Sequence, residues 1–236
     1  VATPKTRMAM PEINIGLYPD VGGSWLLARA PGASGPFLAL TGAHINAADA
    51  VFAGLADFVL AHDRYPAVLD ALRAAQWAAN QADDGAQLSH LLEGLGQGVE
   101  LPASPLRMHF DRIRTVIGHD RLSDIAARMA ALAQDADPWL AQAAQTFLKG
   151  SPTSAALGLE LQRRARNLSL ADTFRLEWQA SVGCCAHTDF AEGVRALLID
   201  KDKQPKWQPA TLAEVTPAWI DDHLKPRFDG AHPLAD

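Results

Sequence analysis

The stretch "MPEINIGLYPDVGG", residues 10–23, places two acids eight positions apart among apolar residues and glycines, Glu12 and Asp20. A carboxylate in apolar sequence is either exposed by a turn or held in a site, where burial raises its pKa toward neutrality. Both interpretations stay open for Glu12. For Asp20 the structural alternative is a turn after Pro19 in which the aspartate caps the following helix.

Paired glycines, Gly22 and Gly23, follow the second acid and precede the helix-like run "SWLLARA". Glycines let the backbone approach a ligand closely, and N–H groups at the start of "GGSWLL" would attract a developing negative charge. We therefore expect these glycines, with the nearby Pro11 and Gly16, to contact substrate.

The composition is that of a soluble globular protein, with 236 residues, 48% hydrophobic and 20% charged. The formal net charge of −6 argues against a general nucleic-acid-binding surface. No apolar run reaches the roughly 18 residues of a membrane span, and no signal peptide is visible. The adjacent Cys184 and Cys185 cannot form an ordinary disulfide, and nothing suggests an oxidising compartment. We expect a cytoplasmic protein without a membrane or nucleic-acid partner.

Helix and strand signals alternate in residues 1–62, which suits part of an α/β core. Helices are predicted over 24–30, 35–42 and 46–54, and a buried strand over 55–60. From residue 63 the pattern is helical, so the predicted domains are 1–62 and 63–236. The expected helices of the second region cover 86–97, 104–118, 137–148, 151–168, 170–187 and 217–224.

The predicted helix over 170–187 aligns Phe174, Trp178, Val182 and Cys185, which we interpret as its core face. The cysteines are therefore expected to be packing residues rather than nucleophiles.

Two further groups of polar residues have a structural and a functional interpretation. His187, Asp189 and Glu192 could be read as metal ligands, but their spacing fits no strong zinc or iron pattern and is better explained by polar residues at a helix end. No metal site is predicted. Near the C-terminus, Lys201, Lys203 and Lys206 form either a local basic patch or a solvated loop.

The sequence resembles the crotonase superfamily of enoyl-CoA hydratases and isomerases in "MAMPEINIGLYPDVGGSWLLARAPG" and "FLALTGAHINAADAVFAGLADFVL". Within it, Asp20 after the proline and the run "DFAEGVRALLIDKDKQPKWQP", residues 189–209, resemble the 3-hydroxyisobutyryl-CoA hydrolase branch. "SPTS" at 151–154 also fits that branch.

The resemblance implies an α/β crotonase-type spiral core in the complete protein. This chain would be a mostly helical C-terminal piece of it, with a few short strands near its N-terminal end and a helical C-terminal region. The family has an upstream half with a glycine-rich turn that supplies part of the oxyanion hole. No such turn precedes Glu12 here, so we expect a longer natural protein.

The resemblance also implies the chemistry, which is hydrolysis of a CoA thioester in valine catabolism without a cofactor beyond the CoA of the substrate. Glu12 would either attack the carbonyl or deprotonate water, and Asp20 would bind the substrate's hydroxyl or orient Glu12 and water. Lys201, Lys203 and Lys206 would approach the CoA phosphates. Expected partners are the acyl-CoA, the upstream half of the same protein, and further copies in a homo-oligomer.

Two alternatives remain open. One is a different crotonase reaction, hydration or isomerisation of an enoyl-CoA. The other is a non-catalytic helical piece that only packs against its upstream half or another subunit. The missing oxyanion turn predicts that the isolated 236-residue chain is inactive.

Overall fold

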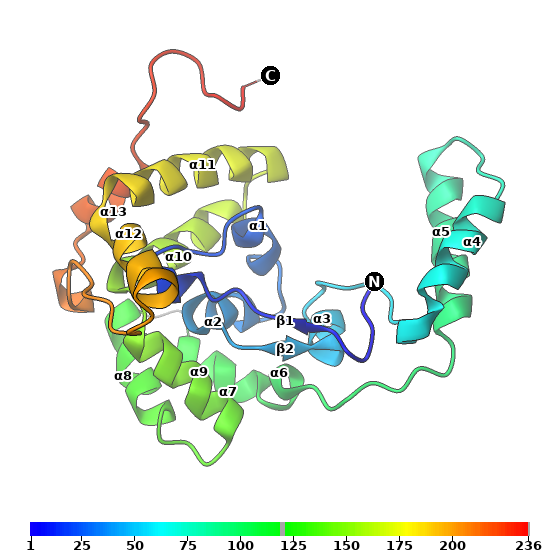
Figure 1. Cartoon of the computed structure of the whole chain (residues 1–236), viewed down its shortest axis with the longest axis horizontal. Helices are drawn as coiled ribbons and strands as arrows, with labels where there is room; N and C mark the ends of the chain where they lie inside the picture. Colours follow the sequence, from blue (N-terminus) through cyan, green and yellow to red (C-terminus); the bar gives the residue numbers. More distant parts are fainter. Residues whose placement is uncertain (119–120, 236) are drawn as a thin grey trace. The chain divides into compact units, whose positions relative to one another are not determined.

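The computed structural model describes residues 1–118 and 121–235 and is mostly helical (Figure 1). Its strands, β1 (Arg7–Met8) and β2 (Ile45–Asn46), pair antiparallel with Arg7 opposite Asn46. The expectation of a mostly helical chain with short strands near its N-terminal end is confirmed. Within the described residues, no helix is long and apolar enough to cross a membrane.

The chain divides into two compact units. Unit 1 comprises Val1–Met8 and His44–Met108, and unit 2 comprises Ala9–Ala43 and His109–Asp236. The domain boundary expected after residue 62 concerns the complete protein and stays a prediction.

Unit 1 is organised around a buried aspartate. Its helices are α3 (Ala47–Phe52), the 3-10 turn η2 (His62–Arg64), α4 (Tyr65–Ala74), α5 (Gln81–Gly96) and α6 (Pro105–Met108). Asn46 and Asp49 cap α3 reciprocally through a capping box. Asp49 Oδ1 also accepts hydrogen bonds from Ser104 Oγ at 2.6 Å and Leu106 N at 2.9 Å, which ties α3 to α6.

The strand predicted over 55–60 is wrong. In the part of the chain that the structure describes, this extended segment pairs only at an isolated bridge between Ala2 and Val59. Ala2 N donates to Phe58 O and Leu60 N donates to Ala2 O, at 2.7 and 2.9 Å. An apolar run becomes a strand only where a neighbour pairs along its length, and no sequence pattern shows that neighbour.

Unit 2 contains the stretch quoted first and the C-terminal helices. Residues 12–15 form the short 3-10 helix η1 (Glu12–Ile15), followed by α1 (Gly23–Leu27) and α2 (Ser34–Thr41). The later elements are α7 (Phe110–Ile117), α8 (Leu122–Leu132), α9 (Pro138–Lys149), α10 (Pro152–Ala165), α11 (Leu170–Ala186), α12 (Thr188–Val194), the π-helical turn η3 (Arg195–Ile199), η4 (Leu212–Glu214) and α13 (Pro217–Leu224).

Most of the predicted helices are present with small differences at their ends. The helix expected over 104–118 is broken into α6 and α7. The helix expected over 24–30 is the shorter α1.

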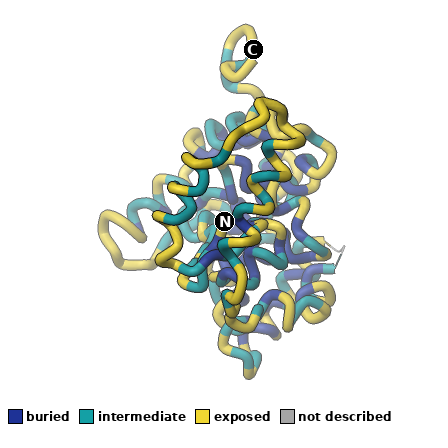
Figure 2. Tube along the Cα trace, turned by 90° about the vertical axis from the view of Figure 1, so that its right-hand side faces the viewer, coloured by how far each residue is buried: buried dark blue, intermediate teal, exposed yellow. Residues whose placement is uncertain are grey.

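A core cluster of unit 2 joins the segment before α1 to the last helices of the chain. Buried stretches lie inside the trace and exposed ones at its outside (Figure 2). Tyr18 packs there with Leu157 and Leu161 of α10 and with Ala180 of α11, while α13 contributes Ile220. Residue 18 is thus anchored by side chains that lie more than a hundred positions later in the sequence.

The predicted core face of α11 is wrong by one position. Its buried residues are Thr173, Glu177, Ala180, Gly183 and Cys184, whereas Phe174 and Cys185 are exposed. One residue corresponds to about 100° of rotation around a helix. The physical reason is close packing, because a Cβ at Gly183 would overlap the backbone of α13 at His223. Small residues therefore mark this face better than large apolar ones.

The backbone of η1 lies directly against α12. A Cβ on Gly16, which ends η1 with φ +74°, would overlap the backbone of Asp189. A Cβ on Gly193 would overlap the backbone of Ile15. Asp189 is 4% exposed and accepts hydrogen bonds from Ser151 Oγ at 2.6 Å and Gln208 N at 2.8 Å. This contact holds the C-terminal end of η1, the short helix that Glu12 begins.

We expect Gly193→Ala to lower the free energy of unfolding of the complete natural polypeptide by about 1–3 kcal/mol, because the added methyl group overpacks a backbone contact. Chemical denaturation measures the effect. The control is Gly94→Ala in α5, where a Cβ meets nothing within 4 Å. There a helix-interior alanine should raise stability by up to about 1 kcal/mol. Equal effects of the two substitutions would contradict the close packing of η1 and α12.

Candidate active site

The structure brings the two predicted acids within electrostatic reach of each other. Glu12 begins η1, and Asp20 lies in the turn before α1. Burial raises the pKa of Glu12, its own backbone N–H opposes the shift, and the negative charge of Asp20 raises the pKa further. Within residues 1–118 and 121–235, Glu12 Oε2 is buried and has no hydrogen-bond partner. An unpaired buried carboxylate oxygen is costly and is typical of a functional group.

Burial also raises the pKa of Asp20, against a hydrogen bond from its own backbone N–H. The backbone carbonyl of Asp20 accepts a hydrogen bond from Gly23 N at 2.7 Å, which closes the turn. The side chain does not cap α1, whose N-cap is Gly22. The structural alternative for Asp20 is therefore right about the turn and wrong about the helix cap.

The residue that caps α1 is Glu177 of α11, which the sequence analysis missed. Its Oε2 accepts a hydrogen bond from Gly22 N at 2.7 Å, and its Oε1 accepts one from Ser24 N at 3.0 Å. Glu177 is 3% exposed, and burial raises its pKa although these N–H groups oppose the shift. The N–H groups that we expected to attract a developing charge thus already bind a carboxylate of this chain.

Tyr18 was also missed. Its side chain is fully buried, and Tyr18 Oη donates to the backbone carbonyl of Glu177 at 2.5 Å and lies 2.8 Å from Ser181 Oγ. Burial raises the pKa of this phenol well above its usual value, so it is a neutral donor. The signal that could have found Glu177 is the buried register of α11, on which it lies.

The predicted substrate contacts have clear structural roles of their own. Gly16 is buried beneath α12, and the N–H groups of Gly22 and Gly23 bind Glu177 and the Asp20 carbonyl. Pro11 lies next to η1 and is exposed. Their contact with substrate stays a prediction.

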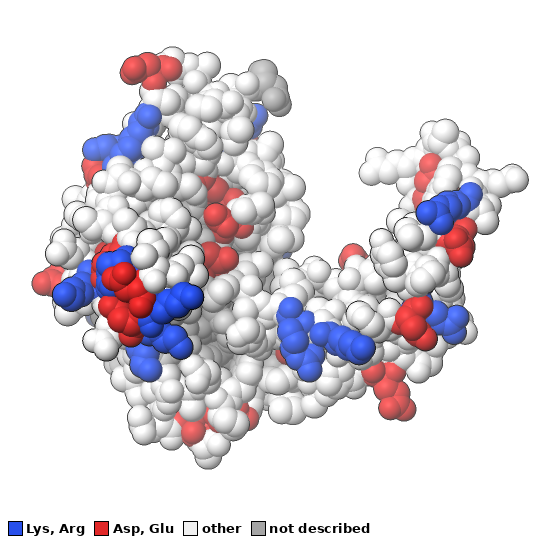
Figure 3. Space-filling view, in the orientation of Figure 1, with Lys and Arg blue, Asp and Glu red and all other residues white. Residues whose placement is uncertain are grey.

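Lys201 and Lys203 are exposed and lie on the loop after η3, with left-handed φ values of +58° and +56°. Arg195 organises this loop, because its guanidinium lies 2.7 Å from carboxylate oxygens of both Asp200 and Asp202. Basic and acidic side chains mix over α12 and this loop (Figure 3). The loop holds its acids close to Arg195 and leaves the lysines at the surface.

The residues considered as metal ligands bind other partners. His187 Nε2 lies 3.1 Å from Asp222 Oδ2, Asp189 binds Ser151, and Glu192 pairs with Arg195. Among the described residues, no group of histidine, cysteine or acidic side chains could hold a metal ion. Burial raises the pKa of the Cys184 thiol to about 12, which fits a packing role.

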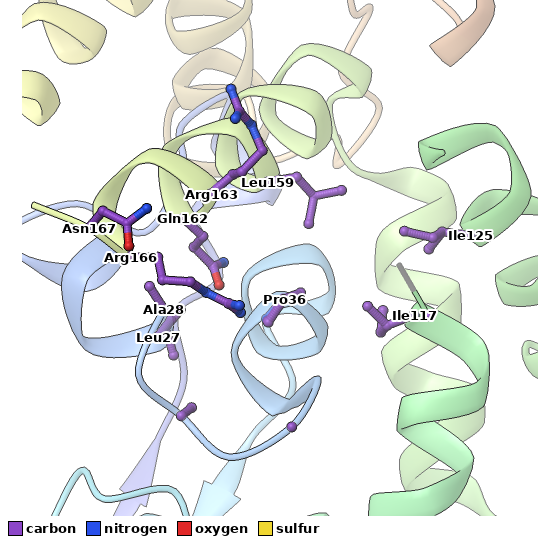
Figure 4. Close-up of a pocket in the computed structure, with 13 residues that line it drawn as sticks. Leu27, Ala28, Pro36, Ile117, Ile125, Leu159, Gln162, Arg163, Arg166 and Asn167 are labelled. Carbon is purple, nitrogen blue, oxygen red and sulfur yellow. The ribbon is translucent and has the colours of Figure 1, made fainter. Parts of the chain in front are cut away.

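A separate pocket of about 420 Å³ lies between α2, α10 and the end of α7 (Figure 4). Leu27, Pro36, Ile117 and Gln162 are among its lining residues. Arg163, Arg166 and Asn167 give this pocket a partly polar lining, while neither amide atom of Gln162 is accessible. None of the three carboxylates described above lines it. We therefore assign the candidate active site to the region of Glu12 and Asp20.

Residues 1–224 match the family model described as enoyl-CoA hydratase/isomerase, and the chain belongs to this family. Among curated relatives, it is 37% identical to the mitochondrial 3-hydroxyisobutyryl-CoA hydrolase of Gallus gallus over 96% of this chain. The corresponding human protein is 33% identical over 95% of this chain. The chain spans 57% of the length of each of these two relatives.

Solved structures also resemble this chain. A carnitinyl-CoA dehydratase from Mycobacterium thermoresistibile matches 98% of this chain and 62% of its own, at a TM-score of 0.81 and 37% identity. An enoyl-CoA hydratase from Rhodobacter sphaeroides matches 95% of this chain and 61% of its own, at a TM-score of 0.75 and 31% identity. The resemblance to the crotonase superfamily is confirmed.

We expect Asp20→Asn to lower the pKa of Glu12, because the substitution removes a negative charge that disfavours ionisation of the Glu12 carboxyl. Carboxyl-carbon NMR titration of the complete polypeptide measures this shift. Asp57→Asn, at an exposed position of unit 1, is the control and should leave the Glu12 titration unchanged. An unaltered Glu12 pKa in Asp20→Asn would show that the two acids do not interact.

Proposed function

We propose that the complete protein hydrolyses an acyl-CoA thioester, with Glu12 and Asp20 as the working carboxylates. The observation that carries this proposal is the buried Glu12 oxygen, which has no partner among the described residues and belongs to an acid whose pKa is raised by burial and by the charge of Asp20. The curated relatives named above make 3-hydroxyisobutyryl-CoA the first substrate to test, in valine catabolism. The names of these relatives include a mitochondrial location, and the cytoplasmic location expected from the sequence stays a prediction.

The chemistry requires a carboxylate that is ionised but not held by hydrogen bonds. Glu12 either attacks the thioester carbonyl, forming a transient anhydride that water cleaves, or removes a proton from the attacking water. Its raised pKa makes it a stronger base than an ordinary surface glutamate. In either route the carbonyl oxygen gains negative charge, which backbone N–H donors must stabilise.

Asp20 has one of two roles in this scheme. Its carboxylate accepts a hydrogen bond from a hydroxyl of the acyl group, or it orients Glu12 and the attacking water. The negative charge of Asp20 raises the pKa of Glu12, so in either role Asp20 also makes Glu12 a stronger base.

The second candidate reaction is hydration of an enoyl-CoA. It is favoured by the names of the two solved structures, a dehydratase and a hydratase. Parallel assays of 3-hydroxyisobutyryl-CoA hydrolysis and crotonyl-CoA hydration distinguish the two reactions.

In the complete polypeptide, we expect Glu12→Gln to lower kcat for hydrolysis by about a thousandfold and Asp20→Asn by about tenfold to a hundredfold. Because Glu12 acts in its ionised form, the wild-type rate should fall toward low pH with a midpoint above the usual glutamate pKa of about 4.3. Release of free CoA thiol measures the rate. The control is Glu93→Gln, at an exposed position of α5. Near-normal turnover by Glu12→Gln would refute the assignment.

The isolated 236-residue chain should show negligible thioesterase activity and should be stable only when paired with other chains, either its upstream half or further copies. Robust turnover by this chain alone would contradict the proposed division of the active site.

The exposed Lys201 and Lys203 are proposed to bind the phosphates of CoA. The double substitution to alanine should raise KM for the acyl-CoA about fivefold with little change in kcat, because it removes uniform binding energy. An acyl-pantetheine thioester without phosphates is the internal control, and its KM should not change. Similar KM changes for both substrates would rule out phosphate binding.

A further inference from the structure

The turn that carries Asp20 has an unusual backbone. Val21 and Gly22 are consecutive residues with left-handed φ values of +53° and +83°. Valine rarely adopts this conformation because its branched Cβ crowds the backbone. Val21 is 77% exposed, so no burial of its own side chain compensates. Contacts from elsewhere in the fold must therefore hold the turn.

Glu177 supplies contacts on the C-terminal side of Asp20. Its two carboxylate oxygens bind the N–H groups of Gly22 and Ser24, at 2.7 and 3.0 Å. Hydrogen bonds from N–H groups to a carboxylate are shorter and stronger than those between neutral groups. The two bonds span the glycine pair and hold the segment that immediately follows Asp20.

Tyr18 supplies a contact on the N-terminal side. Its hydroxyl donates to the backbone carbonyl of Glu177 itself, so both tethers converge on one residue of α11. Ser181, one helical turn later, bonds the same hydroxyl at 2.8 Å. Asp20 thus lies between two attachment points, at residues 18 and 22–24, that share a single anchor.

The Asp20 side chain itself is left out of this arrangement. The shift of its pKa is caused by burial and by its own backbone N–H. The negative charge of Asp20 also acts on Glu177 and on Glu12. A carboxylate whose backbone is held on both sides, and whose head group accepts a hydrogen bond from its own N–H, can bind a substrate while keeping a fixed place.

We propose that Glu177, with Tyr18, is a positioning residue that holds the strained Asp20 turn and thereby fixes the place of the Asp20 carboxylate. This inference rests on the proposed function. It assigns a role to two residues that do not belong to the expected carboxylate pair, and it explains why a glutamate occupies the buried face of α11.

The test is Glu177→Gln in the complete polypeptide. Glutamine has the same shape, but one of its two head atoms is a donor, so it can accept only one of the two N–H bonds. We expect kcat for thioester hydrolysis to fall about tenfold to a hundredfold per folded molecule, with a smaller change in KM, because the misplaced carboxylate acts at the reacting group. The acid limb of the pH–kcat profile should move to lower pH, because a displaced Asp20 carboxylate no longer raises the pKa of Glu12.

Glu160→Gln is the matched control. Glu160 also lies on a helix, and its carboxylate accepts hydrogen bonds from Arg163 and Arg164 at 2.7–2.8 Å. Its substitution should change stability slightly and leave kcat and the pH profile unchanged.

If Glu177→Gln does not fold, Tyr18→Phe replaces it, because phenylalanine keeps the packing and removes only the hydroxyl. It should lower kcat by a smaller factor, with Tyr65→Phe at a 69% exposed position as its control. Reduced thermal stability with normal kcat and an unshifted profile would overturn the positioning role. Loss of the proposed function is recognised separately, because Glu12→Gln would then retain hydrolysis.

Discussion

Direct backbone contact between η1 and α12 is the constraint on which the candidate site depends. Gly16 and Gly193 allow it, because a Cβ at either position would overlap the opposing backbone. The contact is supported by Ser151, whose N–H donates to Ile13 O at 3.0 Å and whose hydroxyl donates to the buried Asp189. A four-residue 3-10 helix has little stability of its own, so its position is set by elements far along the chain.

Buried carboxylates in unit 2 fall into two classes. Asp189 and Glu177 are almost inaccessible, and each accepts hydrogen bonds that offset the loss of hydration. Glu12 differs, because within the described residues one of its oxygens is buried and unpaired. Burial raises the pKa in both classes, so the proposed functional acid is set apart by one buried oxygen that no donor of the described residues reaches.

Local sequence signals predicted local structure well. Asn46 caps α3, Asp137 caps α9 and Ser151 caps α10. Each does so through side-chain hydrogen bonds that span only a few residues. The errors concern long-range contacts. The segment 55–60 has a strand-like sequence, but within the described part of the chain it pairs at one bridge, to Ala2. The buried face of α11 is set by the close approach of α13 at Gly183.

The sequence by itself determined the family resemblance, the mostly helical character of the chain and the two acids of the quoted stretch, because these depend on motifs and on short-range periodicity. Only the tertiary structure showed that the charge of Asp20 acts on Glu12, that Gly16 serves packing, and that Glu177 caps α1 from 153 or more positions away. The reason is physical. Hydrogen bonds and burial act through space, and a glutamate inside a helix carries no local mark of the backbone N–H groups that folding brings to it.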